Sequence, residues 1–203
     1  VIETNVHYPT NNSLLWDCIK ESSRLLRQLK GEMESIEYLD YTKSAKKTYF
    51  KINNTKSPEK REELFKMQLV VFTKTINNVS NAVKKKSENL TAKVLQVKLE
   101  DFMGVMERVY YMVYTKEVLG APLTDAEKLY SIYELHTDII VKGGRDIQFG
   151  HKVNITTGKS NLILDCEVLQ GNPSDKDLYQ PTIERITSNY NTIPRDVATD
   201  GGY

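Results

Sequence analysis

The chain has 203 residues, 39% of them hydrophobic and 27% charged, which is ordinary globular usage and enough to build a buried core. No stretch approaches the roughly 20 apolar residues of a membrane span, and the first residues lack the basic-then-apolar pattern of a signal peptide. Cys18 and Cys166 have no metal-ligand spacing, so we expect two buried, reduced thiols and a cytoplasmic location.

The net charge of +1 hides an uneven distribution along the chain. Residues 20–116 hold 20 Lys and Arg against 12 Asp and Glu, whereas the remaining residues hold 8 against 15. A basic segment of this kind favours contact with a polyanion, and an acidic segment can hold cations.

The first half of the chain predicts a short strand followed by long helices. Residues 1–6 are rich in β-branched side chains, which indicates a strand. A 3.6-residue apolar period predicts a helix over 13–30, capped by Asn12 or Ser13, and helical character continues over about 33–52. Further helices are expected over about 59–85 and 88–119, the last stopped by Gly120 and Pro122. The expected inner face of the 59–85 helix is Leu64, Met67, Val71, Ile76, Val79 and Val83.

Beyond residue 120 the pattern changes from helical to extended. Thr124 and Glu127 form a capping box that opens only a short helix. A two-residue period then predicts a β-hairpin over 147–169, with its apolar side chains facing the core. Ser174 is placed to cap a helix that ends near Tyr190, and 195–199 is expected to be a short strand. The expected inward residues of the hairpin are Ile147, Phe149, His151, Val153, Ile155, Leu162, Leu164, Cys166 and Val168.

Asp200 follows the predicted 195–199 strand and precedes two glycines. A carboxylate held at a strand end can bind Mg²⁺, which prefers oxygen ligands, although Asp-Gly is also an ordinary turn signal. The three histidines lack the spacing of a zinc site, and His151 is favoured as a semi-buried, hydrogen-bonded residue.

Two lysine clusters stand out in the basic segment. Lys84, Lys85 and Lys86 close one predicted helix, and Lys43 and Lys47 share a face of another together with two further lysines. Each cluster is compatible with a solvated face or with favourable charge at a helix C-terminus. Taken with the local charge, they favour phosphate contact.

Several strings, in order, resemble bacterial insertion-sequence transposases of the DDE type. Phe-Gly-His-Lys-Val at 149–153, Gly-Asn-Pro-Ser-Asp at 171–175 and Ala-Thr-Asp-Gly-Gly-Tyr at 198–203 are similar to the blocks around the second catalytic acid. Residues 1–10 and 13–17 resemble the segment after the first catalytic Asp, and 131–138 resembles a further block.

The resemblance implies an α/β fold, a ribonuclease-H-like mixed sheet with a large all-helical insertion between the first and second strands. Its expected parts are a first strand and turn over 1–12, a helical insertion over 13–135, and a hairpin, helix and fourth strand over 136–203. Three acids of the family hold two Mg²⁺ or Mn²⁺ ions for in-line attack on a phosphodiester. Only the second acid falls within the chain, as Asp200, so the chain alone is expected to be inactive.

The resemblance therefore predicts a transposase fragment that acts by metal-dependent cleavage and strand transfer at insertion-sequence ends. Its expected partners are double-stranded DNA of transposon ends and target, and further copies of the chain on that DNA, in a bacterial cytoplasm and without a membrane. Two alternatives stay open: a non-catalytic DNA-binding or helical interaction protein, such as a transposon remnant, and a ribonuclease or resolvase on the same fold. The expected DNA contacts are Lys84, Lys85, Lys86, Lys43, Lys47 and Lys152.

Overall fold

The computed structural model describes residues 9–142, 146–171 and 173–199. These residues divide into two compact units. Residues 9–135 form the first, which we call the helical unit, and the described residues from 136 onward belong to the second, which we call the strand unit. The strand expected over 1–6 lies outside the described residues.

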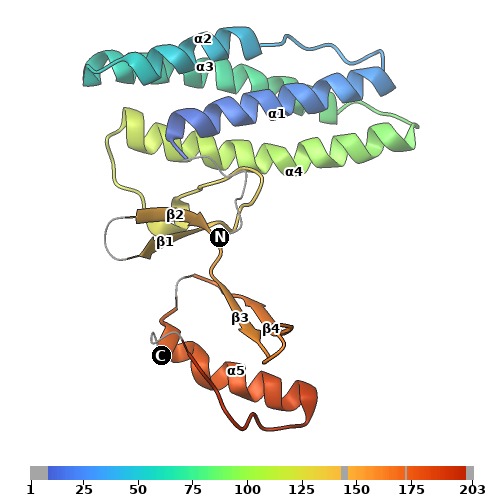
Figure 1. Ribbon diagram of the computed structural model, residues 1–203. Helices are drawn as coiled ribbons and strands as arrows, with labels where there is room; N and C mark the ends of the chain where they lie inside the picture. Colours follow the sequence, from blue (N-terminus) through green and yellow to red (C-terminus); the bar gives the residue numbers. More distant parts are fainter. Residues whose placement is uncertain (1–8, 143–145, 172, 200–203) are drawn as a thin grey trace. The chain divides into compact units, whose positions relative to one another are not determined.

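Four long helices build the helical unit and lie lengthwise against one another (Figure 1). They are α1 (Asn11–Glu32), α2 (Thr42–Asn54), α3 (Pro58–Val83) and α4 (Leu90–Val113). α1 and α3 each pack against the other three helices, whereas α2 and α4 are not in substantial contact with each other. Side chains along α1 are fully buried and form the middle of the core, among them Leu15, Cys18, Ile19, Leu26 and Leu29.

The start of α1 is fixed by a reciprocal cap. Thr10 Oγ1 accepts from the Ser13 amide at 3.0 Å, and the Thr10 amide donates to Ser13 Oγ at 2.8 Å. These two bonds satisfy amides that the first turn of a helix leaves without partners. The helix therefore begins at Asn11, two residues earlier than the sequence predicted, with Thr10 as the cap in place of Asn12 or Ser13.

The expectation of continuous helix over 33–52 is wrong for its first part. Residues 33–41 form a non-helical connection, in which Ile36 is fully buried. Asp40 Oδ1 accepts from the Thr42 amide at 2.9 Å, which occupies a free donor where α2 starts. The connection sets α2 beside both α1 and α3.

α3 buries most of the predicted face, but the centre of the buried face lies elsewhere. Of the predicted residues, Val79 is fully buried, and Leu64, Val71, Ile76 and Val83 are partly buried against the core. The predicted stripe included Met67, which is 58% exposed. Phe65 and Phe72, which are seven residues apart and share a face of the helix, are fully buried. Leu69, between them on the same face, is buried as well. Each phenylalanine ring removes more apolar area from water than one of the aliphatic side chains, so Phe65 and Phe72 mark the centre of the buried face.

α4 does not run to residue 119 as one regular helix. It passes into a π-helix, η1 (Tyr114–Val118), closed by a bond from the Leu119 amide to Tyr114 O at 3.1 Å. Gly120, with φ of 65°, then turns the chain, as its position after the last helical residue predicted. A single 3-10 turn follows, η2 (Asp125–Glu127), where the Thr124 amide donates to Glu127 Oε2 at 2.8 Å.

The strand unit contains two separate antiparallel pairs and one helix (Figure 1). β1 (Asp138–Lys142) pairs with β2 (Asp146–Gly150), and β3 (Val153–Thr157) pairs with β4 (Ile163–Val168). The first strand of the hairpin predicted over 147–169 is broken at Gly150. Residues before the break belong to β2, which pairs with β1, and residues after it belong to β3, which pairs with β4. The φ of 154° at that glycine is a conformation that other residues rarely adopt. α5 (Asp175–Tyr190) follows and packs against β4.

The β3–β4 hairpin turns its polar face, not its apolar face, toward α5. Asn154 Nδ2 donates to Thr182 Oγ1 at 2.8 Å, and Arg185 pairs with Asp165 and Glu167, both at 2.8 Å. The opposite face, which the sequence predicted to be buried, is exposed; it carries Val153, Ile155, Cys166 and Val168. The specific polar contacts with α5 determine which face is covered.

The ribonuclease-H-like prediction is wrong. The described residues are mainly helical, their two sheets are two-stranded and antiparallel, and no strand forms over 195–199, where every residue is exposed. A mixed sheet needs a parallel pair joined by a crossover, and the described residues contain none. Among these residues, no helix combines the length and the apolar character required to cross a bilayer.

Candidate nucleic-acid interface

α2 presents the most uniformly basic surface of the helical unit. Its sequence contains four lysines and no acidic residue, and all four lysines are exposed. Only Ala45 and Ile52 of this helix are buried, so most of its circumference faces solvent. None of the four pairs with a carboxylate of the described residues. We call this surface the α2 basic face; it consists of Lys43, Lys46, Lys47 and Lys51.

An exposed aromatic ring lies within the α2 basic face. Phe50 is 52% exposed and follows Lys46 and Lys47 by one helical turn, the spacing at which side chains are neighbours. Its ring packs edge-on against Tyr49 at 5.5 Å between centroids, and Tyr49 reaches Trp16 of α1 at 6.2 Å. This chain of rings anchors one side of Phe50 and leaves the other in solvent.

Polar contacts with α1 and α3 hold α2 in place. Asn12 Nδ2 donates to Tyr49 O at 2.9 Å and to Asn53 Oδ1 at 2.8 Å. Gln68 Nε2 of α3 donates to Ala45 O at 3.3 Å. The lysines of α2 therefore project from a helix whose orientation is fixed at both ends.

The second predicted cluster has a different environment. Lys84, Lys85 and Lys86 are exposed at the end of α3, and Lys85 Nζ donates to Ser35 O of the connection between α1 and α2. The stretch from Glu32 to Asp40 that borders this contact is acidic, and Glu32 itself accepts from Asn89 at 3.1 Å. Because Lys85 is already engaged and the adjoining stretch 32–40 is acidic, we rank this cluster below the α2 basic face as a phosphate site.

Lys152 has a structural role in the strand unit. Its ammonium donates to Pro173 O at 2.7 Å and forms an ion pair with Asp175. These contacts join the start of β3 to the start of α5, and the side chain is only 20% exposed. The prediction that Lys152 contacts nucleic acid has no support from this arrangement.

Asp200 lies outside the described residues, so its expected metal-binding role stays a prediction. Within the described part of the chain, no three His, Cys, Asp or Glu side chains are grouped as a metal site requires. His136 and His151 stack with ring centroids 4.6 Å apart, and His151 Nδ1 lies 4.0 Å from Asp138 Oδ2. That oxygen also accepts from the Gly171 amide at 2.9 Å, which ties β1 to the loop before α5.

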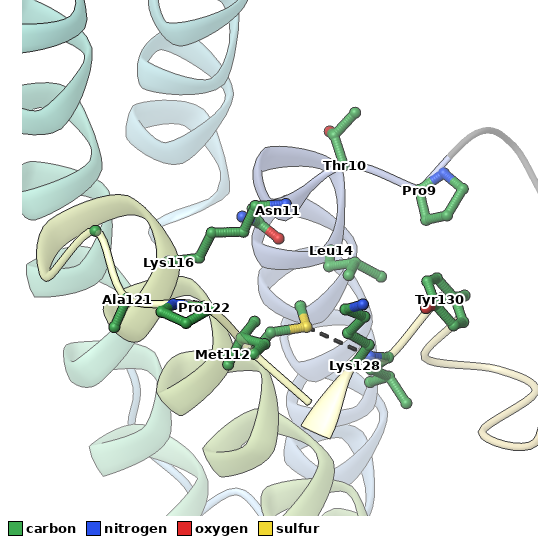
Figure 2. Close-up of a pocket in the computed structure, with 13 residues that line it drawn as sticks. Pro9, Thr10, Asn11, Leu14, Met112, Lys116, Ala121, Pro122, Lys128 and Tyr130 are labelled. Atoms are coloured by element: carbon green, nitrogen blue, oxygen red, sulfur yellow. Dashed lines mark hydrogen bonds between the residues drawn. The ribbon is translucent and has the colours of Figure 1, made fainter. Parts of the chain in front are cut away.

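A pocket of about 410 Å³ opens beside η1 in the helical unit (Figure 2). The start of α1, the end of α4 with η1, the turn over 120–123 and residues 128–130 all contribute to its wall. Leu14, Met112 and Leu129 are nearly fully buried and form an apolar lining, while Lys116 and Lys128 bring positive charge to it. The Leu129 amide donates to Met112 Sδ at 3.4 Å, drawn as a dashed line in Figure 2.

Sequence reasoning missed this pocket. Its residues come from two parts of the chain, 9–14 and 112–130, that are far apart in sequence, and neither carries a ligand-binding motif of its own. The turn signal of Gly120 and Pro122 marked one wall, but only the packing of α1 against α4 brings the start of α1 to it. The π-helix, a feature often found at functional sites, has no sequence signature in this segment.

Comparison with protein-family models gives a match to the xRRM domain over residues 1–118, which is more than half of the chain. The chain therefore belongs to the xRRM domain family, an RNA-binding, RRM-like family. No curated protein and no solved structure matches the chain. The matched residues that the structure describes, 9–118, are helical and contain no strand. RNA-recognition motifs ordinarily present a four-stranded sheet to RNA, so the exposed helix surfaces become the candidates for contact.

The family match overturns the interpretation of the chain as a DDE transposase fragment. The predictions of cleavage and strand transfer at insertion-sequence ends, and of double-stranded DNA as the partner, are therefore wrong as well. The strings at 149–153 and 171–175 that suggested the transposase lie outside the matched segment. In the structure, the first of them spans the break between β2 and β3, and Lys152 within it is used for packing.

Proposed function

We propose that the helical unit is a non-catalytic module that binds single-stranded RNA through the α2 basic face. The proposal is carried by one helix of a chain in the xRRM domain family, on which a half-exposed phenylalanine lies among four lysines that form no ion pair with any described residue. This proposal keeps the non-catalytic alternative of the sequence interpretation and replaces DNA by RNA as the partner.

The chemistry of the α2 basic face suits an unpaired strand. Lysine ammonium groups attract phosphates without regard to sequence, and an exposed aromatic ring offers a surface on which an unpaired base can stack. Bases within a duplex are already stacked on their neighbours and do not present their faces to Phe50. The combination of charge and ring therefore favours single strands over duplex DNA.

The size of each contribution can be estimated. Neutralisation of a single-strand phosphate gives a slope of about −0.7 per contact in a plot of log affinity against log salt, so four lysines give about −2.8. Stacking of one base on an aromatic ring is worth about 1–3 kcal/mol. The charge contribution depends on salt and the stacking contribution does not, so a salt titration separates them.

The test is fluorescence anisotropy with a short labelled single-stranded RNA at several NaCl concentrations. The variant Lys43→Gln/Lys46→Gln/Lys47→Gln/Lys51→Gln should lose most of the salt dependence and bind far more weakly at low salt. The matched control Lys84→Gln/Lys86→Gln removes two exposed lysines from the cluster at the end of α3 and should retain most of the affinity. Far-UV circular dichroism checks that each variant is folded.

Phe50→Ala tests the stacking contribution separately. We expect affinity to fall by the factor that corresponds to about 1–3 kcal/mol, with the salt slope unchanged. An equal affinity and slope for wild type and the four-lysine variant would show that α2 is not the contact surface. Tighter binding of duplex DNA than of single-stranded RNA would contradict the choice of ligand.

A further inference from the structure

The pocket beside η1 has the construction of a site for a small anionic ligand with a flat apolar part. Its volume, about 410 Å³, lies in the range of about 300–1,000 Å³ that is usual for small-molecule sites. Leu14, Met112 and Leu129 supply an apolar lining, and each is less than 5% exposed. These three side chains form the floor, and the more exposed Pro122 and Leu123 offer the apolar surface that can cover one face of a planar ring.

Positive charge is concentrated at this pocket. Lys116 and Lys128 both line it, and Lys116 is exposed and forms no ion pair with a described residue. The adjacent carboxylate, Glu117, accepts a bond from Asn11 Nδ2 at 2.6 Å. Figure 2 shows Lys116 extending from its helix toward Asn11, across the opening between η1 and the start of α1.

The π-helix determines where Lys116 projects. A bond from the Leu119 amide to Tyr114 O, at 3.1 Å, spans five residues, and the Ala121 amide reaches Thr115 O at 3.0 Å. The wider turn shifts the side chains that follow Val113 relative to those of a regular α-helix. At the start of α1, by contrast, the amides of Thr10 and Ser13 are already engaged in the reciprocal cap, so binding of an anion here is assigned mainly to Lys116.

From this geometry we infer that the pocket binds a nucleoside phosphomonoester, with the base against the apolar lining and the phosphate near Lys116. The choice of a nucleotide rests on the proposed RNA-binding function, whereas the apolar lining and the charge are independent of it. The same chemistry is offered by a free nucleotide and by the phosphorylated end of an RNA strand. The pocket is large enough for a single nucleotide and is separate from the α2 basic face, which has no residue in its wall.

The experiment uses the full chain and uridine 3′-monophosphate, with uridine and inorganic phosphate as partial ligands. Binding is followed by the methyl resonances of Met112 and Leu14, which report from the apolar lining. We expect saturable shifts with the nucleotide, and at least tenfold weaker binding of uridine and of inorganic phosphate. Lys116→Gln should weaken nucleotide binding about tenfold, the loss expected for one charge-assisted hydrogen bond. The control Lys98→Gln changes an exposed lysine of α4 outside the pocket wall and should have no effect.

Absence of saturable shifts, equal binding of uridine and its phosphate, or no effect of Lys116→Gln would each overturn the inference. RNA strands ending in a 3′-phosphate or a 3′-hydroxyl distinguish the two sources of ligand. Stronger binding of the phosphorylated strand, lost in Lys116→Gln, indicates an RNA end, and binding of the free nucleotide alone indicates a small-molecule site. The four-lysine variant of α2 separates the two proposals, because it should lose RNA affinity and still bind the nucleotide.

Discussion

Two buried glutamines of the helical unit are expected to respond in opposite ways to the same substitution. Gln96 of α4 donates from Nε2 to Ala82 O at 3.0 Å and to Lys85 O at 2.6 Å, with a longer contact to Val83 O. It therefore adds a side-chain donor to carbonyls at the end of α3, where Ala82 O also accepts from the Lys85 amide at 3.4 Å. Gln68 of α3 makes one contact, 3.3 Å long, and its buried Oε1 has no hydrogen-bond partner.

Methionine has nearly the shape of glutamine and no amide. Gln96→Met removes two short hydrogen bonds, each worth about 1 kcal/mol net, and takes the side-chain donor away from the carbonyls of Ala82 and Lys85. We expect the free energy of unfolding to fall by about 2–3 kcal/mol. Gln68→Met removes one long bond but also removes a buried, unsatisfied oxygen, which costs about 1–3 kcal/mol to keep. We expect it to be neutral or to stabilise the protein by about 1 kcal/mol.

Urea unfolding, followed by far-UV circular dichroism, measures both variants, since most of the helical signal comes from this unit. The comparison is internally controlled, because the residue type, the replacement and the burial are alike. Equal destabilisation by the two substitutions would refute the reasoning, since it would mean that loss of the glutamine shape, and not the hydrogen-bond pattern, sets the cost. A neutral Gln96→Met would show that the end of α3 does not need this side-chain donor.

The two thiols give further predictions. Cys166 is exposed and Cys18 fully buried, so a thiol reagent should modify Cys166 at once and Cys18 only at the rate of unfolding, and equal rates would contradict the burial of α1. Burial, with a smaller contribution from Asp17, raises the pKa of the Cys18 thiol well above its usual range. As pH rises past the ordinary thiol pKa of about 8.5, the unfolded chain ionises first, so the unfolding free energy should fall by up to about 1.4 kcal/mol per pH unit. Cys18→Ala should flatten this alkaline decline, and an unchanged slope would exclude the thiol as its cause.

The long helices were predictable because the 3.6-residue apolar period extends over several turns in each. The residues at which the helices end, and the faces that they bury, were less predictable. Phe65 and Phe72 lie at the centre of the buried face of α3 but were not in the predicted stripe, and Phe72 stacks on Tyr110 of α4, a residue distant in sequence. Cys166 was expected to be buried. It is exposed because α5 covers the opposite, polar face of the β3–β4 hairpin, through contacts of Arg185 and Thr182. A two-residue period identifies two faces of a strand and does not say which one a helix will cover.

The candidate interface was only partly visible in the sequence. Lys43 and Lys47 were identified from their helical spacing, and the structure shows that α2 keeps them clear of carboxylates. Lys85 was not distinguishable from them, because its contact with Ser35 depends on the path of a connection that the sequence suggested was helical. The resemblance to transposases relied on short strings outside the basic segment 20–116. Local similarity of such short strings does not require a common fold.

The packing of α1 against α4 also has a consequence for synthesis of the chain. α1 is made first, yet one of its partners is α4, which ends at Val113. α2 and α3 can pair as neighbours in sequence, but the inner surface of α1 stays incompletely covered until α4 has emerged from the ribosome. For much of translation, Leu15, Ile19 and Leu26 are therefore an apolar stripe open to chaperones, and completion of α4 is the event that closes the core.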